Sequence, residues 1–254
     1  MIHRSCLKSL VTVSLLGLMS ASQAEVTASA NVSLTSDYRF RGVSQNINSA
    51  GVDAEPALQG GFDLEFGNGF YLGNWNSNVS FDGSTLEMDF YGGYAAEVGE
   101  FNYDLGVLYY YYPGQNETND NAAGSDDVDT LELYGFLGYH GFTLGLAYTI
   151  SDDYFGTDNQ DGTTYLTLSY DHSFTDKLSL TARIGQTSYQ NEAAFNASTE
   201  GDYVDYLVGL NYNFAGFDFG LSYVDTDIET NAALGSTRNN LNDGTVIFSV
   251  GKSF

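Results

Sequence analysis

Apolar and polar residues alternate along most of this chain with a period of two. From Val204 to Phe214, apolar side chains occupy every even position, while aspartate, glycine and asparagine occupy most of the positions between them. The segments 217–224 and 245–254 repeat the pattern. Because successive side chains of a β-strand point to opposite faces, the alternation predicts strands with one apolar face and one polar face.

Twelve segments carry this signal, and the connections between them alternate in length. We expect strands at about 26–41, 56–66, 70–81, 85–97, 102–112, 128–139, 142–150, 163–171, 178–189, 203–214, 217–224 and 245–254. Connections after even-numbered strands are tight and mostly contain glycine, whereas those after odd-numbered strands are long and polar, except at 82–84. A soluble β-sandwich would show the same alternation, but short turns at one rim and long loops at the other are typical of an outer-membrane barrel.

The predicted fold class is therefore all-β: a transmembrane antiparallel up-and-down β-barrel of about 12 strands, integral to the outer membrane of a Gram-negative bacterium. Strands of about ten residues match the roughly 9–11 that cross a bilayer at a tilt of ~45°. Hydrocarbon offers no hydrogen-bond partner to an open sheet edge, so the first and last strands should pair and close the barrel.

Aromatic residues near the ends of the predicted strands indicate girdles at the two membrane interfaces. The candidates are Tyr38, Phe40, Phe70, Tyr71, Phe81, Tyr109, Tyr111, Tyr139, Phe142, Tyr148, Tyr170, Phe214 and Phe217.

The last residue, Phe254, follows alternating apolar residues and resembles the C-terminal signal of outer-membrane barrels. We therefore expect outer-membrane lipid, lipopolysaccharide and, through the C-terminal strand, the barrel-assembly machinery as partners.

The N-terminus has the pattern of an export signal. Basic residues precede an apolar run at 10–19, and small residues at 22 and 24 form a cleavage site before Glu25. The pattern predicts a signal peptide over 1–24, export through the periplasm, and an outer-membrane β-barrel domain over 25–254. Cys6 lies in the signal, so the mature chain has no cysteine.

The composition excludes several protein classes. The chain has 33 Asp and Glu against 8 Lys and Arg, a net charge of −25. Residues 1–24 contain two of those bases and no acid, so the mature balance is 33 acids against 6 bases, or −27. A nucleic-acid binder would need a basic surface. The longest apolar run is too short for a spanning helix of roughly 20 residues, and 15% aromatic residues argue against disorder.

Three N-terminal segments resemble a known family. They read SDYRFRGVSQ at 36–45, PALQGGFD at 56–63 and GFYLGNWNSNVSF at 69–81. These segments are similar to the TorF family of outer-membrane porins, most densely over 33–112. The resemblance implies a pore-forming barrel and indicates no particular solute.

The residues that alternate with the apolar positions should face the barrel interior. The predicted lumen acids are Asp63, Glu65, Glu87, Asp89, Asp104, Glu132, Asp205 and Asp218, and the predicted lumen bases are Arg39, Arg41 and Arg183. Asn74, Asn76, Asn78, Thr143, Thr167, Ser169, Thr181, Asn211 and Ser222 are expected on the same face. An acidic wall of low dielectric favours counter-ions, so we expect a channel for small hydrophilic solutes or ions that prefers cations. The arginines could instead bridge carboxylates and plug the lumen, as in small filled barrels.

Two other function classes remain as alternatives, a structural or adhesin-like barrel with a plugged lumen and an outer-membrane barrel enzyme. The mature chain contains only His140 and His172, which are both assigned to short turns, so we expect no enzyme and no catalytic residue.

The long loops hold seventeen acids and one base, which indicates a solvated anionic rim. The segment starting at Asp158 is not an EF-hand loop, because its twelfth position is Ser169, so we expect no metal and no cofactor.

Overall fold

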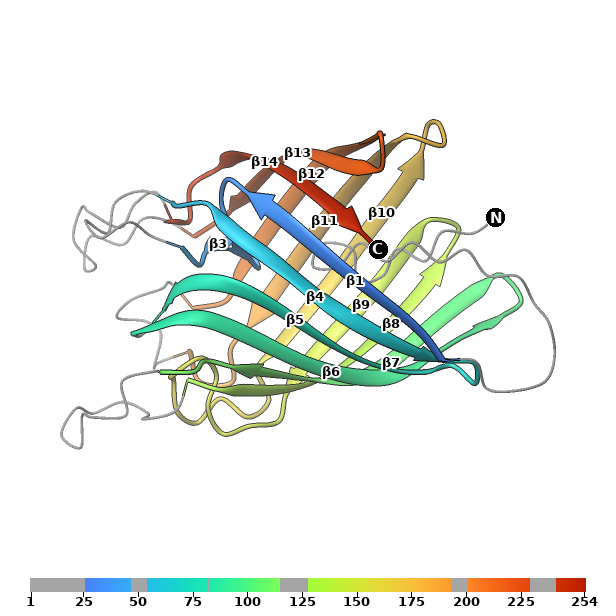
Figure 1. Cartoon of the computed structure of the whole chain (residues 1–254). Helices are drawn as coiled ribbons and strands as arrows, with labels where there is room; N and C mark the ends of the chain where they lie inside the picture. Colours follow the sequence, from blue (N-terminus) through green and yellow to red (C-terminus); the bar gives the residue numbers. More distant parts are fainter. Residues whose placement is uncertain (1–25, 47–53, 82, 115–127, 193–200, 229–240) are drawn as a thin grey trace.

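The computed structural model describes residues 26–46, 54–81, 83–114, 128–192, 201–228 and 241–254. In these residues twelve strands form one closed antiparallel barrel (Figure 1). Its strands are β1 (Val26–Thr35), β4 (Ala57–Phe66), β5 (Phe70–Phe81), β6 (Ser84–Val98), β7 (Phe101–Tyr111), β8 (Thr130–Tyr139), β9 (Phe142–Thr149), β10 (Thr164–Ser173), β11 (Leu178–Ser188), β12 (Tyr203–Phe214), β13 (Phe217–Thr226) and β14 (Thr245–Ser253). The predicted all-β antiparallel barrel of twelve strands is confirmed.

Each barrel strand pairs with its neighbours in the chain, and β1 closes the barrel by pairing with both β4 and β14. Because β1 and β14 are antiparallel, the start of β1 and the end of β14 lie at the same end as the short turns (Figure 1). Phe254 extends this closure, since its backbone N–H donates to the Ala30 carbonyl at 2.8 Å. Its side chain is 72% exposed.

The short turns use backbone conformations that favour glycine. His140 and Gly141 between β8 and β9 have φ of 48° and 85°, and Ala215 and Gly216 between β12 and β13 have φ of 52° and 78°. Two consecutive positive φ values are typical of the two-residue hairpin turns whose twist matches that of the strands.

The outward face of the barrel is apolar and exposed. Leu166 and Leu168 of β10 and Val208 and Leu210 of β12 are each between 45% and 53% exposed. Exposed aromatic residues lie near the strand ends, as at Phe142. Three of the predicted girdle residues do not lie on the outer face. Their burial and their position in the strand register place Tyr38, Phe40 and Tyr71 in the barrel interior. The side chain of Phe81 lies outside the described residues.

The first strand is shorter than predicted, and this difference shapes the interior. β1 ends at Thr35, and the chain then forms a small hairpin of β2 (Arg39–Phe40) and β3 (Val43–Ser44). Arg41 and Gly42 form its turn, with φ of 47° and 86°. We call residues 36–46 the inward segment, because Tyr38 and Arg41 in it are 3% and 6% exposed. Arg39 and Arg41 were predicted on the first strand and instead lie on this segment.

An aromatic cluster packs the inward segment against one side of the barrel interior. Tyr38 contacts Trp75 of β5 edge-on, with ring centroids 5.4 Å apart. Phe40 contacts Tyr110 of β7 and Phe155 of the β9–β10 connection in the same way, at 5.6 and 5.3 Å. The β4–β8 side of the lumen is therefore filled by side chains near the loop end.

The predicted inward face of β5 is wrong. Trp75 and Ser77 are buried inside, at 3% and 1% exposed, so Asn74, Asn76 and Asn78 point outward. Their cross-strand partners are the outward residues of β4 and β6; Asn74, for example, is opposite Phe62 and Phe90. The Asn amides donate to backbone carbonyls, of Asp89 at 2.9 Å, Gly60 at 3.2 Å and Pro56 at 3.3 Å, which satisfies polar groups on an apolar face.

The predicted signal peptide over 1–24 lies outside the described residues. No helix in the described part of the chain has the length and hydropathy needed to cross a bilayer.

Candidate functional site

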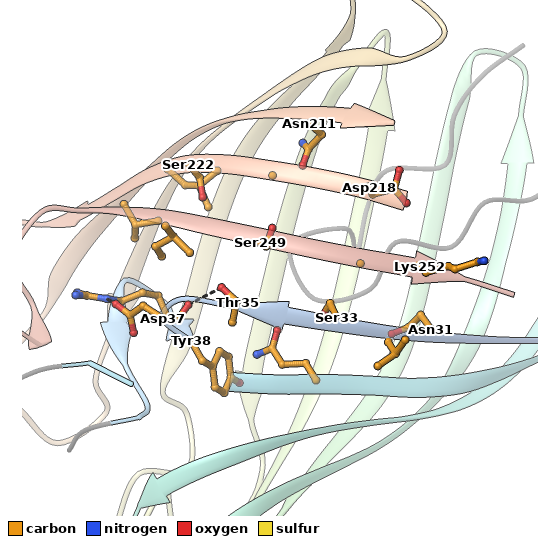
Figure 2. A pocket seen from close by; sticks show the side chains of 18 of the residues that line it. Asn31, Ser33, Thr35, Asp37, Tyr38, Asn211, Asp218, Ser222, Ser249 and Lys252 are labelled. Carbon is orange, nitrogen blue, oxygen red and sulfur yellow. Dashed lines mark hydrogen bonds and ion pairs between the residues drawn. The ribbon is translucent and has the colours of Figure 1, made fainter. Parts of the chain in front are cut away.

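Two cavities, of about 210 and 180 Å³, lie between the described residues of the barrel interior. The first lies between β1 and β11–β14, and Figure 2 shows Asn31, Ser33, Asn211, Ser222 and Ser249 around it. The second lies against β6–β11 and has more aromatic residues in its walls. The two cavities adjoin, because both are lined by Arg39, Arg183 and Leu207.

Arg41 ties the inward segment to the barrel wall. Its Nη2 donates to both carboxylate oxygens of Glu132 on β8, at 2.8 and 2.7 Å, and its Nη1 donates to the Tyr154 hydroxyl at 2.9 Å. The guanidinium also lies over the Tyr165 ring, 4.4 Å from its centroid. Charge-assisted hydrogen bonds of this kind are stronger than neutral ones, so Arg41 and Glu132 hold the segment inside the barrel.

The other two arginines are also engaged. Arg39 pairs with Asp37 at 2.5 Å and donates to the Leu241 carbonyl, which joins the inward segment to the residues before β14. Arg183 of β11 pairs with Asp205 of β12 at 3.1 Å. Each of the three arginines therefore pairs with one carboxylate. Such pairs are part of what the plugged-lumen alternative predicts.

Tyrosine hydroxyls donate to five of the eight predicted lumen carboxylates. Glu87 of β6 accepts from two of them, Tyr38 at 2.7 Å and Tyr112 at 2.9 Å. Burial, reinforced by the Glu87 charge, raises the pKa of Tyr38 and of Tyr112 well above the ordinary value, so both hydroxyls remain protonated donors. The other such pairs are Tyr91 with Asp63, Tyr71 with Asp104, Tyr110 with Glu132 and Tyr165 with Asp205.

Asp89 lies two residues from Glu87 on the same face of β6 and is 3% exposed. Within the described residues, nothing donates a hydrogen bond to its buried Oδ1, and the same holds for Oδ2 of Asp63. An uncompensated buried carboxylate oxygen is unfavourable, so these two positions store free energy in the folded barrel.

The last two predicted acids lie nearer the turn end. Asp218 of β13 borders the first cavity and accepts from the Asn213 amide at 2.8 Å. Glu65 of β4 is opposite Tyr71 and shares its inward face. All eight predicted lumen acids thus occupy inward positions, and the interior brings together Glu87 and Asp89, Glu132 and Arg41, and Asp205 and Arg183.

Aromatic rings lie along the wall, over inward glycines of the adjacent strand. A Cβ atom at Gly73 would fall 2.3–2.5 Å from the Tyr91 ring, and one at Gly145 would fall 2.6 Å from Phe136. Three further pairs repeat the arrangement: Tyr71 with Gly93, Tyr134 with Gly106 and Tyr165 with Gly185. The glycines are needed for this close approach, because any larger side chain would collide with the aromatic side chain opposite it.

The sequence reasoning missed these tyrosines, although a signal for them was present. Tyr91 is at the same parity as Glu87 and Asp89, and Tyr134 is at the same parity as Glu132. An aromatic residue at an inward position, two residues from a carboxylate, marks a ring that lines the interior. Because only polar residues were assigned to the inward face in the sequence analysis, these tyrosines were not included.

No group of three or more His, Cys, Asp or Glu side chains suited to a metal ion occurs in the part of the chain that the structure describes. His140 lies in the β8–β9 turn, 3.4 Å from Glu100, and is 59% exposed in its side chain. His172 lies near the end of β10 and is also exposed.

A comparison with protein families identifies the family of this chain. A family model described as a bacterial protein of unknown function, Gcw_chp, matches residues 19–254. The chain belongs to the Gcw_chp family. No curated protein matches this Gcw_chp chain in sequence.

The Gcw_chp barrel is similar to solved porin structures. The KdgM porin, in complex with disordered oligogalacturonate, gives a TM-score of 0.51 at 10% identity, covering 90% of this chain and 98% of that chain. The NanC porin gives 0.52 at 10% identity, with 89% and 98% covered. OccAB4 of Acinetobacter baumannii gives 0.43 at 14% identity; 84% of this chain is covered, and it spans 56% of that chain. At this identity the first two similarities show that the fold is a porin-type barrel.

Proposed function

We propose that this protein is an outer-membrane channel that passes small hydrophilic solutes or ions. The observation that carries the proposal is a closed barrel with an apolar outer face and two adjoining interior cavities, both of which have polar and charged side chains in their walls. An apolar outer face suits lipid, and polar interior space suits water and solutes. The fold similarity to the KdgM and NanC porins and the resemblance to the TorF porins support the same function.

The proposed location is the outer membrane of a Gram-negative bacterium, reached through the periplasm after removal of the signal peptide. Lipid and lipopolysaccharide would contact the outward leucines, valines and aromatic residues. The barrel-assembly machinery would engage the C-terminal strand, where Phe254 is exposed and pairs with the first strand through its backbone.

The proposed selectivity is a preference for cations. The eight predicted lumen carboxylates, together with Asp37 and Asp171 of the cavity walls, outnumber the inward bases, which are Arg39, Arg41, Arg183 and Lys252. Tyrosine hydroxyls, which carry no charge, stabilise several of these carboxylates without neutralising them. A negative field in a low-dielectric wall lowers the free energy of a cation in the lumen.

A structural or adhesin-like barrel with a plugged lumen is the second candidate. The observation that favours it is the inward segment, which is anchored by Arg41 and packed by Tyr38 and Phe40 against one side of the lumen. An enzyme has less support, because His140 and His172 are exposed near the turns and lie apart from the interior carboxylates.

Planar-bilayer recording of the refolded protein separates the candidates. A channel gives discrete current steps, and cation preference displaces the reversal potential in a salt gradient toward the cation potential. A silent bilayer from protein that still migrates as a folded, heat-modifiable barrel would instead favour the plugged structural barrel.

A further inference from the structure

The second cavity has an aromatic wall. Tyr91, Tyr134, Phe136 and Tyr165 line it, and each of these rings lies over an inward glycine of a neighbouring strand. This wall therefore offers an extended apolar surface inside a lumen that is otherwise polar.

Hydroxyl groups line the adjoining wall of the same cavity, on β10 and β11. Thr167 and Ser169 are partly exposed and line the cavity, so their hydroxyls are accessible to an occupant. Thr181 and Asp171 also line the cavity, and the Thr181 hydroxyl donates to Asp171 Oδ1 at 2.7 Å. Thr167 and Phe136 are both opposite Gly145, so a hydroxyl and an aromatic ring lie side by side over this glycine.

The charges around the cavity do not favour a cationic ligand. Arg39, Arg41 and Arg183 all line it, and the acidic residues of its lining are Glu132 and Asp171. Two of the arginines are already held by Glu132 and Asp205. An occupant should therefore have little net positive charge, an apolar face for the rings and several hydroxyls for the threonine, serine and aspartate side chains.

We propose that this cavity is a binding subsite for a saccharide ring, which combines an apolar C–H face with peripheral hydroxyls. The inference rests on the proposed function, since the cavity belongs to the interior of the proposed channel. Stacking on Phe136 and hydrogen bonds to Thr167 and Ser169 select a cyclic polyol over an open-chain one. The solute class of the channel is then small saccharides.

The test measures binding and conduction separately. Maltotriose is titrated into the detergent-solubilised protein by calorimetry and, in parallel, added to the protein in a planar bilayer. Sorbitol, an open-chain polyol, is the control ligand. We expect heat of binding and transient current blockades with maltotriose and neither with sorbitol.

Two matched pairs of variants locate the subsite. Thr167→Val removes an inward hydroxyl, and Thr164→Val makes the same change on the outward face of β10, opposite Tyr148. Phe136→Leu removes an inward ring, and Phe142→Leu removes one that is 51% exposed on the outside. Loss of one neutral hydrogen bond, or of one ring contact, should weaken maltotriose binding about fivefold for each inward variant and leave the outward variants unchanged.

The outcomes distinguish the two proposals. A conducting protein that maltotriose neither binds nor blocks, or that binds it equally in the inward and outward variants, overturns the saccharide subsite and leaves the channel standing. A protein that never conducts but binds maltotriose with the expected losses overturns the channel and supports the subsite.

Discussion

The guanidinium of Arg41 donates two hydrogen bonds to the carboxylate of Glu132, at 2.8 and 2.7 Å, across 91 residues of chain. Both side chains are buried, at 5% and 2% exposed. Since Arg41 is on the inward segment and Glu132 is on β8, this contact ties the segment to the barrel wall.

Removing the arginine should free the segment and leave Glu132 buried without its charge partner. We expect Arg41→Ala to lower the free energy of unfolding by roughly 3–5 kcal/mol, and to raise single-channel conductance because the lumen is less obstructed. Thermal melts and bilayer recording measure the two effects. The double variant Arg41→Met with Glu132→Met removes both charges and should recover most of the stability. Unchanged conductance in a folded Arg41→Ala barrel would show that the segment does not restrict the lumen.

Tyr38 is the second anchor of the inward segment, through its 2.7 Å hydrogen bond to Glu87. Tyr38→Phe keeps the contact with Trp75 and removes only the hydroxyl, so the variant should lose about 1.5–3 kcal/mol, the range for hydrogen bonds to charged groups. The matched control is Tyr111→Phe, since Tyr111 is 39% exposed on the outer face. Equal losses in the two variants would argue against a stabilising role for the Tyr38 hydroxyl.

Alkaline pH should loosen the same anchor. The pKa values of Tyr38 and Tyr112 are raised in the folded protein, first by burial and then by the Glu87 charge. Their contribution to stability is therefore complete below the unfolded pKa of ~10 and is lost as the pH rises through the folded values. An absorbance titration should show a class of tyrosines that ionises only with unfolding and that shrinks in Tyr38→Phe. Full, reversible ionisation of the folded barrel near pH ~10 would contradict this.

The packing of Tyr91 over Gly73 predicts a coupled pair of substitutions. The three atoms nearest to a Cβ at Gly73 all belong to the Tyr91 ring, at 2.3–2.5 Å. Gly73→Ala should therefore displace the ring and destabilise the barrel by about 1–3 kcal/mol. In a Tyr91→Ala background the same substitution should cost little, which a double-mutant cycle of unfolding free energies measures. Additive effects would mean that the ring does not occupy this position.

Glu87 and Asp89 offer the clearest test of charge selectivity. Glu87→Gln with Asp89→Asn removes two interior carboxyl groups and the negative charge that the pair carries, so the reversal potential in a salt gradient should move away from the cation potential. Asp89→Asn alone should also stabilise the barrel, because its Oδ1 is buried without a hydrogen-bond partner in the described structure. Asp176→Asn in the exposed β10–β11 turn is the control. An unaltered reversal potential in the conducting double variant would remove these residues from the selectivity mechanism.

The interior acids could be predicted from sequence because each occupies a strand position that alternates with the outward apolar residues. The partners of those acids could not. Glu132 and Arg41, or Asp63 and Tyr91, are far apart in the chain and meet only when the barrel closes. On β5 the parity itself was misleading, since Asn74 faces outward and donates to a backbone carbonyl of the next strand.

The sequence by itself determined the strands, the turns and the apolar outer face of this barrel, because each depends on neighbouring residues: a period of two for the strands, and positive φ at pairs such as His140 and Gly141 for the turns. Only the tertiary structure decided that residues 36–46 fold into the lumen rather than continue the first strand. That outcome depends on Glu87 and Glu132, whose buried carboxylates bind Tyr38 and Arg41 and compensate the cost of leaving water.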